Sequence, residues 1–322
     1  MTEQEKQELV HLEKICFQNP TATIIRCDSL LMNSLNLNFL AKVTFCKAEA
    51  YKTRTDYKKA IELYEMSLDY FYKTHNYSFQ TKILNRISWI NTIQGNYLTA
   101  IDLANKSLKI AEDRNLEKSI FDSYNTLSFI YSSNNDYEKA IKFLHENEDN
   151  FSQKTSAAEI SSTYNDLSVV YQKMSDMDNA ILYNKRVFDV ITDNNLIEYY
   201  GIYYNNTGSL YYQFDKKEKA LEYFKKAVEI NEKTNKLKSN PIRGVAKVQL
   251  KIGKNSLAKE NYSLALQIDK KKNNLSGIVM ALSGLIEVSK ANNDCNEIII
   301  YQKQRDSVNQ LINKNKADEN LR

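Results

Sequence analysis

The chain has 322 residues, of which 42% are hydrophobic and 26% charged, and it contains only 7 glycines and 2 prolines. With so few turn formers and helix breakers, the composition excludes a loop-rich or disordered chain and favours an all-helical one. The 44 basic and 40 acidic residues are spread along the sequence, so the net charge of +4 argues against direct binding of nucleic acid or of an acidic membrane surface.

The first 40 residues predict a helical hairpin. One helix is expected over Glu3 to Phe17, and a second begins near Pro20, a residue suited to the first position of a helix. The start of the chain is polar and no run reaches about 18 apolar residues, so we expect no export signal and no membrane span within this sequence. This predicts a cytoplasmic protein, or a periplasmic one if the native gene has an export signal that this sequence lacks.

A repeat of 40 residues begins near residue 41. It is marked by an alanine that returns at constant spacing, with a sixth copy after a step of 38: Ala60, Ala100, Ala140, Ala180, Ala220 and Ala258, and Ile298 in a seventh copy. Twelve residues before each stands another small residue: Ala48, Ser88, Ser128, Ser168, Gly208 and Ala246, with Ile286 in the seventh copy. A fixed period of this length indicates a repeat architecture.

Each repeat predicts two successive helices. In the third copy Tyr124, Leu127, Ser128 and Tyr131 follow the i, i+3, i+4, i+7 spacing of a buried helical stripe. A short polar turn follows, and its last residue can cap the second helix: Asp56, Asn96, Asp136, Asp176 or Asp294. Because one hairpin cannot cover its own apolar faces, the hairpins must stack into a solenoid.

The chemistry-bearing residues do not predict an enzyme. Cys16, Cys27, Cys46 and Cys295 lack the spacing of a metal site, and buried free thiols are favoured over a Cys16–Cys27 pair. None of the three histidines stands at a spacing that a helix would turn into a catalytic set, and no glycine-rich phosphate loop occurs. We therefore expect no catalytic residues, no metal and no cofactor.

The repeat resembles the tetratricopeptide repeat family. Its pattern of small residues, aromatics and alanines is carried by Gly208, Tyr211, Ala220, Phe224 and Ala227, and the resemblance extends from residue 41 to the end. The period of 40 is longer than the family's commonest 34 and is similar to that of kinesin light chains and of bacterial sensory and regulatory repeat proteins.

The resemblance implies an all-α, right-handed α-solenoid of about seven stacked antiparallel hairpins. The repeats would start near residues 41, 81, 121, 161, 201, 239 and 279. Residues 1–40 would form a degenerate N-terminal cap, 41–318 the superhelix and 319–322 a tail. In the seventh copy the polar Gln302, Arg305 and Asp306 fall where the second helix should pack, which suits an end cap or a helix that continues into a further domain.

An asparagine recurs in four consecutive first helices: Asn85, Asn125, Asn165 and Asn205. Asparagine is a mediocre helix former, so its return calls for a compensating gain. The face beside it includes further candidate contact residues, which are Lys82, Arg86, Trp89, Phe129, Gln172 and Tyr212. In tetratricopeptide proteins the first helices line the concave, ligand-binding surface. The resemblance to kinesin light chains and to bacterial pheromone receptors implies that these asparagines grip a peptide backbone.

The geometry of such an asparagine ladder is physically reasonable. A carboxamide can bond both the C=O and the N–H of an extended peptide without reading its side chains. With first helices ~10 Å apart and ~3.3 Å per peptide residue, four rungs would span roughly nine residues. Two alternatives stay open for the asparagines: they bond a neighbouring repeat and set the superhelix, or they reflect a chain rich in asparagine throughout.

The sequence does not predict a second mode of ligand binding that occurs in this family. Co-chaperone tetratricopeptide domains clamp a C-terminal carboxylate with a lysine where this chain has Asn125 and an asparagine where it has Phe129. Basic residues on the expected inner face, which are Lys82, Arg86, Arg243, Lys247 and Lys251, still leave room for an acidic ligand segment.

The preferred function is therefore a non-catalytic adaptor or sensor that holds an extended peptide or protein segment. One alternative is the input module of a bacterial signalling protein, a helix-turn-helix regulator or a histidine kinase, whose output domain is absent from this chain. Another is a structural scaffold that self-associates, with a homodimer as its simplest form. The sequence does not identify the ligand.

Overall fold

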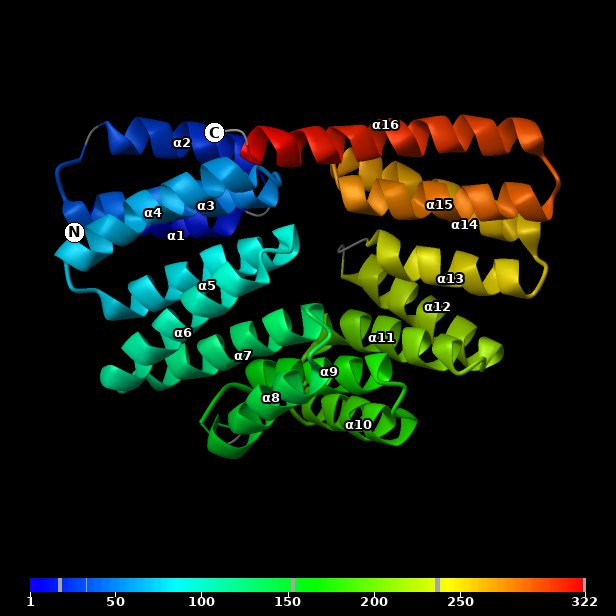
Figure 1. The fold of residues 1–322 in the computed structure, drawn as a ribbon, viewed down its shortest axis with the longest axis horizontal. Coiled ribbons are helices and arrows are strands. Elements are labelled where there is room, and N and C mark those ends of the chain that lie inside the picture. Colours follow the sequence, from blue (N-terminus) through cyan, green and yellow to red (C-terminus); the bar gives the residue numbers. More distant parts are fainter. Residues whose placement is uncertain (17–18, 33, 152–153, 235–237, 321–322) are drawn as a thin grey trace. The chain divides into compact units, whose positions relative to one another are not determined.

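The computed structural model describes residues 1–16, 19–32, 34–151, 154–234 and 238–320. Within them the chain is all-α: sixteen α-helices and one short 3₁₀ helix, without a strand. They form two compact units, Met1–Thr155 and Ser156–Arg322, which are described in turn. The protein is an α-solenoid of helical hairpins (Figure 1).

The first unit contains eight helices. Their bounds are α1 Glu3–Ile15, α2 Pro20–Leu31, α3 Leu37–Thr53, α4 Tyr57–Lys73, α5 Tyr77–Gln94, α6 Tyr97–Asp113, α7 Glu117–Ser133 and α8 Tyr137–Phe151. Pro20 occupies the first turn of α2, as predicted, and the Asn19 side chain caps that helix. Phe17, where the sequence predicted the end of the first helix, lies outside the described residues.

The second unit holds the remaining elements. They are α9 Ala157–Lys173, α10 Met177–Asp193, η1 Ile197–Tyr199, α11 Tyr200–Gln213, α12 Lys217–Lys233, α13 Ser239–Lys251, α14 Asn255–Lys271, α15 Leu275–Ala291 and α16 Cys295–Asn320. Helix α16 has 26 residues, against 17 in α9, α10, α12, α14 and α15. No helix in the described part of the chain is long and apolar enough to cross a membrane. The predicted boundaries at residues 40 and 318 stay a prediction.

Small residues hold the two helices close together in the hairpins from α3–α4 to α13–α14. The repeat alanines from Ala60 to Ala258 are fully buried. Opposite them, the Ser88 hydroxyl donates to the carbonyl of Ala100 at 2.7 Å, and the Ser168 hydroxyl donates to that of Ala180 at 2.8 Å. Gly208 packs against the ring of Phe224 so tightly that an added Cβ would overlap it. A larger side chain at either position would force the helices apart.

The predicted helix caps are confirmed except at one position. Four carboxylates accept a backbone N–H three residues along the chain; they are Asp56, Asp136, Asp176 and Asp294. Asn96 stands at the N-cap of α6, but its side chain makes no capping hydrogen bond, so that prediction is wrong. The Asn36 and Asn76 side chains do cap α3 and α5, so residue type alone does not decide whether an amide caps a helix.

The first unit has a further set of bonds inside its hairpins. In α4, α6 and α8, the second helices of their hairpins, the same repeat position holds a buried polar side chain. It donates to the carbonyl of a residue on the first helix, 26 residues earlier in the chain. The pairs are Ser67 to Ala41 at 2.7 Å, Ser107 to Thr81 at 3.1 Å and Asn147 to Phe121 at 3.1 Å. In the second unit this position holds Val187, Ala227 and Ala265, so apolar packing replaces the bond.

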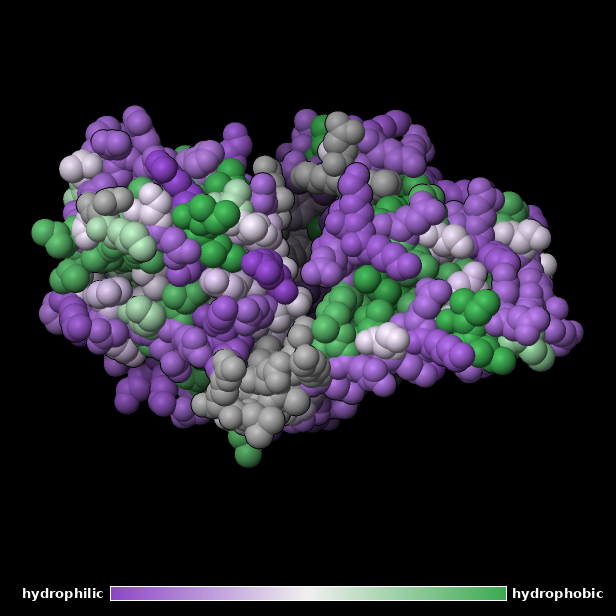
Figure 2. All heavy atoms as spheres, turned by 90° about the horizontal axis from the view of Figure 1, so that it is seen from above, coloured by the Kyte–Doolittle hydropathy of each residue, from purple (hydrophilic) through white to green (hydrophobic). Residues whose placement is uncertain are grey.

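Exposed large apolar side chains occur in both units, for example Met66 and Leu98 in the first and Leu182 and Ile300 in the second. On the face that Figure 2 shows, hydrophilic residues predominate and hydrophobic ones form small islands between them. Single exposed apolar side chains are normal on a folded protein.

Replacing Ser107 by alanine should lower the free energy of unfolding by about 1 kcal/mol, because it removes buried hydrogen bonds to Thr81 and Ser123. Urea unfolding followed by circular dichroism measures the change. Ser162→Ala, at an exposed position of α9, is the matched control and should have no effect. Equal stability of the two variants would contradict the role given to the Ser107 hydroxyl.

Candidate functional site

A groove of about 270 Å³ lies between α5 and α7 in the first unit. We call it the α5–α7 groove. Six of the predicted contact residues line it together: Lys82, Asn85, Arg86, Trp89, Asn125 and Phe129; Asp122 and Thr126 complete the lining. Both helices are the first of their hairpins, so the predicted face of these helices does border an open groove.

Aromatic and charged contacts join side chains that line the α5–α7 groove. The rings of Trp89 and Phe129 stack with centroids 6.3 Å apart and an interplanar angle of 17°. Arg86 donates through Nε to the Glu49 carboxylate at 3.0 Å. Burial works to raise the pKa of Glu49, yet Lys52 and Arg86 hold that pKa below its ordinary value. Arg86 is thus anchored on one edge of its guanidinium group.

The two asparagines of this groove also bond other side chains of the unit. Asn85 is only 5% exposed, and its Nδ2 donates to the Ser123 hydroxyl at 3.3 Å. Asn125 accepts through Oδ1 from Nδ2 of Asn147 on α8 at 2.8 Å. The Oδ1 of Asn85 has no hydrogen-bond partner among the described residues. Both amides therefore contribute to the packing of the unit.

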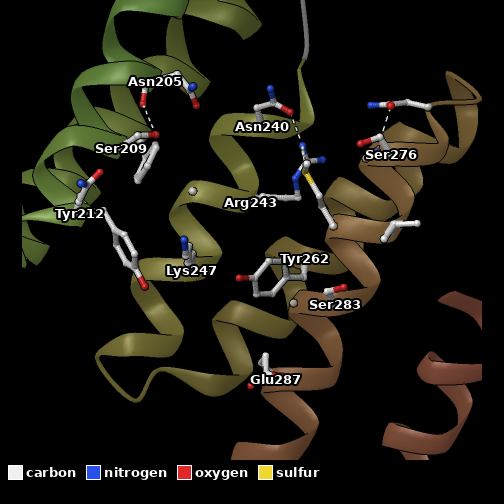
Figure 3. A pocket seen from close by; sticks show the side chains of 18 of the residues that line it. Asn205, Ser209, Tyr212, Asn240, Arg243, Lys247, Tyr262, Ser276, Ser283 and Glu287 are labelled. Atoms are coloured by element: carbon white, nitrogen blue, oxygen red, sulfur yellow. Dashed lines mark hydrogen bonds between the residues drawn. The ribbon is translucent and has the colours of Figure 1, made fainter. Parts of the chain in front are cut away.

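A larger groove, of about 1000 Å³, lies in the second unit (Figure 3). We call it the α9–α15 groove, because the first helices α11, α13 and α15 supply most of its walls and Gln172 of α9 adds to them. The predicted residues Gln172, Asn205 and Tyr212 line it. The rings of Phe224 and Tyr262 reach it from the second helices α12 and α14. Asn165 lines neither groove.

Glycines open this groove toward the two rings. An added Cβ at Gly244 would overlap the ring of Phe224, and one at Gly284 would overlap that of Tyr262. Without side chains there, the rings lie against the helix backbone and remain part of the lining. Sequence reasoning missed these residues, although one signal was present: five of the 7 glycines stand inside helices between residues 201 and 284.

An ion pair fixes one wall of the α9–α15 groove. Arg243, which stands where earlier repeats have asparagine, donates to the buried Asp269 carboxylate. Asp269 also accepts from the Ser239 hydroxyl at 2.7 Å and from Nδ2 of Asn274 at 2.8 Å. The carboxylate is therefore fully engaged. Arg243 acts as a structural residue at the edge of the groove (Figure 3).

Lysine and tyrosine meet on the α11 side of the groove. Nζ of Lys247 lies 4.5 Å from the ring centroid of Tyr212, a favourable cation–π distance. Nζ of Lys251 lies 5.0 Å from the same ring and pairs with Asp215 at 2.5 Å. Lys247 has no carboxylate partner in the described part of the chain.

A row of amides runs along α9 and α11. Nδ2 of Asn205 donates to Oδ1 of Asn206 at 3.2 Å, and Nδ2 of Asn206 donates to Oδ1 of Asn165 at 2.6 Å. Nδ2 of Asn165 lies 3.5 Å from Oδ1 of Asp166. Burial raises the pKa of Asp166 to about 6. The sequence interpretation did not include Asn206 or Asp166.

The thiols lie apart from both grooves. Cys16, Cys27 and Cys46 are buried and free, as predicted, and Cys295 is exposed. Burial raises the pKa of Cys16 to about 11 and that of Cys27 to about 12, so both stay protonated at neutral pH. The described residues hold no group of three His, Cys, Asp or Glu side chains that could bind a metal ion.

Family models match the repeats directly. A tetratricopeptide repeat model matches residues 159–233, and a second one matches residues 121–146. The chain therefore contains tetratricopeptide repeats in these two stretches. No curated protein sequence matches it.

Solved structures with the same fold include three tetratricopeptide-like solenoids. The first is a signal transduction ATPase with numerous domains, with a tetratricopeptide repeat sensor, from Pyrococcus horikoshii (TM-score 0.64, 14% identity); the alignment covers 98% of this chain and 48% of that one. The second is a Rap protein complexed with competence and sporulation factor (0.67, 12% identity, 89% and 80% covered). The third is NprR in complex with its cognate peptide NprX (0.54, 12% identity, 94% and 78% covered). At these identities the likeness concerns the fold.

Asp166 should destabilise this tetratricopeptide protein at neutral pH. Its pKa is raised from 3.8 to about 6, so the folded chain binds a proton more tightly than the unfolded chain, and stability falls as the pH rises between these values. Asp166→Asn should therefore raise the free energy of unfolding at pH 7.5 by about 2 kcal/mol, with no gain at pH 4. Thermal melts across this range measure it; a lower melting temperature at pH 7.5 would contradict the assignment.

Proposed function

We propose that this tetratricopeptide protein is a non-catalytic adaptor or sensor that holds an extended peptide along its first helices. The observation that carries the proposal is the α9–α15 groove, which the first helices α11, α13 and α15 line together with Gln172 of α9. With neighbouring helices ~10 Å apart, four of them would be crossed by roughly nine extended residues. A groove shared by several repeats is suited to a long ligand.

The lining of the groove has the chemistry of a peptide site. Two rings, Phe224 and Tyr262, and the 56% exposed Met280 offer apolar contacts. Around them stand amides and hydroxyls, among them Asn205, Ser209 and Asn240, which can bond a peptide backbone (Figure 3). An apolar floor with a few polar groups is the usual composition of a ligand site.

The four asparagines of the ladder have different roles in this proposal. Asn205 keeps its Oδ1 without a partner among the described residues, while its Nδ2 is held by Asn206. Nδ2 of Asn125 likewise has no partner among the described residues, while its Oδ1 accepts a hydrogen bond from Asn147. A side chain fixed on one end and open on the other is oriented in advance for a ligand. We assign backbone contact to these two, and a larger packing role to Asn85 and Asn165.

The solved structures support the type of partner. NprR was solved with its cognate peptide, and the Rap protein with competence and sporulation factor. Both have the fold of this chain over most of its length. They support a peptide-binding solenoid and do not identify the peptide.

Blocking the groove should abolish peptide binding. Met280→Trp places a bulky ring at its exposed edge, and Leu264→Trp introduces the same ring on α14 at an exposed residue outside the groove lining. We expect at least a tenfold weaker affinity of Met280→Trp for decapeptides selected from a random library, measured by fluorescence anisotropy. The Leu264→Trp variant should bind like the wild type. Equal affinities of the two variants would exclude the α9–α15 groove as the site.

Replacing Asn205 tests whether the asparagine ladder binds the peptide backbone. Asn205→Ala should weaken the same peptides about tenfold, equivalent to about 1.4 kcal/mol, because it deletes a contact to the peptide backbone. The melting temperature should change little, because the Asn205 side chain makes only one hydrogen bond among the described residues. A large fall in melting temperature with unchanged affinity would show that the asparagine is structural.

The sensor alternative has one observation in its favour. The chain spans 48% of the signal transduction ATPase, a protein with a tetratricopeptide repeat sensor. On this second proposal the chain is the input module of a signalling protein. Sequencing the native gene on both sides of the coding region tests it: a kinase, an ATPase or a DNA-binding domain in the same reading frame supports it, and stop codons at both ends exclude it.

A further inference from the structure

Three side chains that can donate hydrogen bonds line one stretch of the α9–α15 groove. They are Tyr212 of α11, Lys247 of α13 and Tyr262 of α14. Nζ of Lys247 lies 4.5 Å from the ring centroid of Tyr212, and Figure 3 shows this lysine between the rings of the two tyrosines. We call these three side chains the Tyr–Lys–Tyr cluster.

The hydroxyl of Tyr262 has no hydrogen-bond partner among the described residues. Tyr262 is only 6% exposed, and a tyrosine buried to this extent usually bonds its hydroxyl to another group. The oxygen is not fully enclosed, and Figure 3 shows it on the side of the ring that faces Lys247, so a ligand in the groove can reach it. Burial raises the pKa of Tyr262 to about 12, so the hydroxyl stays protonated at neutral pH and can donate.

The charges of the groove leave one positive charge in excess at this cluster. Three charged side chains line the groove: Arg243, Lys247 and Glu287. Arg243 is paired with the buried Asp269, and Glu287 pairs with Lys290 at 2.8 Å. Lys247 has no carboxylate partner in the described part of the chain and contacts the neutral ring of Tyr212 instead. A single negative charge of a ligand would balance it.

The groove continues past the cluster on both sides. It extends to Gln172 of α9 in one direction and to Ser283 and Glu287 of α15 in the other. An extended peptide along the first helices would therefore pass the cluster rather than end at it. This position is suited to a side chain of the peptide and not to its terminus.

We infer that the Tyr–Lys–Tyr cluster is the subsite for one acidic side chain of the bound peptide, an aspartate or a glutamate. This inference rests on the proposed peptide-binding function and adds to it a residue that the groove selects. The ammonium of Lys247 supplies the counter-charge, and the hydroxyls of Tyr262 and Tyr212 donate to a carboxylate, which can accept about four hydrogen bonds. A phosphate group carries about two negative charges and would exceed the single positive charge of the cluster.

The test uses the full chain and defined decapeptide pools. One central residue is fixed as Glu, Gln or Lys, all other positions are drawn from uncharged residues, and both ends are blocked. A fourth pool has the fixed Gln and a free C-terminus. Affinities at pH 7.5 are measured by fluorescence anisotropy, together with melting temperatures, for the wild type and for Tyr262→Phe and Lys247→Gln.

Two matched control variants come from α12. Lys219→Gln replaces a lysine whose Nζ lies 5.2 Å from the ring centroid of Tyr211, and Tyr223→Phe removes a partly exposed phenol hydroxyl. Neither Lys219 nor Tyr223 lines the α9–α15 groove. The controls therefore repeat both chemical changes outside the proposed subsite.

We expect the wild type and both controls to bind the Glu pool at least tenfold more tightly than the Gln pool, and the Lys pool most weakly. Tyr262→Phe and Lys247→Gln should each reduce the preference for Glu at least threefold while their affinity for the Gln pool and their melting temperatures stay unchanged. A merely structural role would not change the charge preference alone.

Three results would overturn the inference and leave the proposed function standing. They are equal binding of the Glu and Gln pools to the wild type, a preference for Glu that survives in both groove variants, and a preference only for the free C-terminus. No binding of any pool to the wild type overturns both the inference and the proposed function.

Discussion

The close approach of the two helices in each hairpin is the constraint on which the rest of the structure depends. Six of the seven hairpins from α3 to α16 have a small residue at both of two positions 12 apart, and the pairs Ser88–Ala100 and Ser168–Ala180 add a hydroxyl-to-carbonyl bond across the contact. With the second helices packed this tightly against the first, the free faces of the first helices border the grooves of each unit. The same spacing therefore sets both the fold and the place of the candidate site.

The two units meet the demands of packing differently. In the first, buried polar side chains such as Ser107 and Asn147 bond the first helix from within, and the groove stays small. In the second, alanine and valine replace them, and glycines let the rings of Phe224 and Tyr262 reach a groove of about 1000 Å³. In the second unit, glycines on α13 and α15 remove side-chain packing there and leave the groove open. A helical glycine costs about 1 kcal/mol relative to alanine, so the opening has a real thermodynamic cost.

The repeat and its helix caps could be predicted from the sequence because they depend on local spacing, which a 40-residue period displays directly. The grouping of Lys82, Asn85, Trp89 and Asn125 around one groove could also be predicted, since all lie on equivalent helix faces. The side-chain hydrogen bonds of the ladder asparagines could not be predicted. They depend on Asn147 and Asn206, which do not recur in the repeat. The lack of a capping hydrogen bond from Asn96 could not be predicted either, because residue type alone does not determine where an amide points.

The most direct test of the proposed peptide site is a crystal structure of the full chain with the tightest decapeptide selected from a random library. We predict an extended peptide along α11, α13 and α15, with its backbone bonded by Asn205 and its side chains against Phe224, Tyr262 and Met280. A peptide bound instead to the outer faces of α10, α12 and α14 would contradict this prediction.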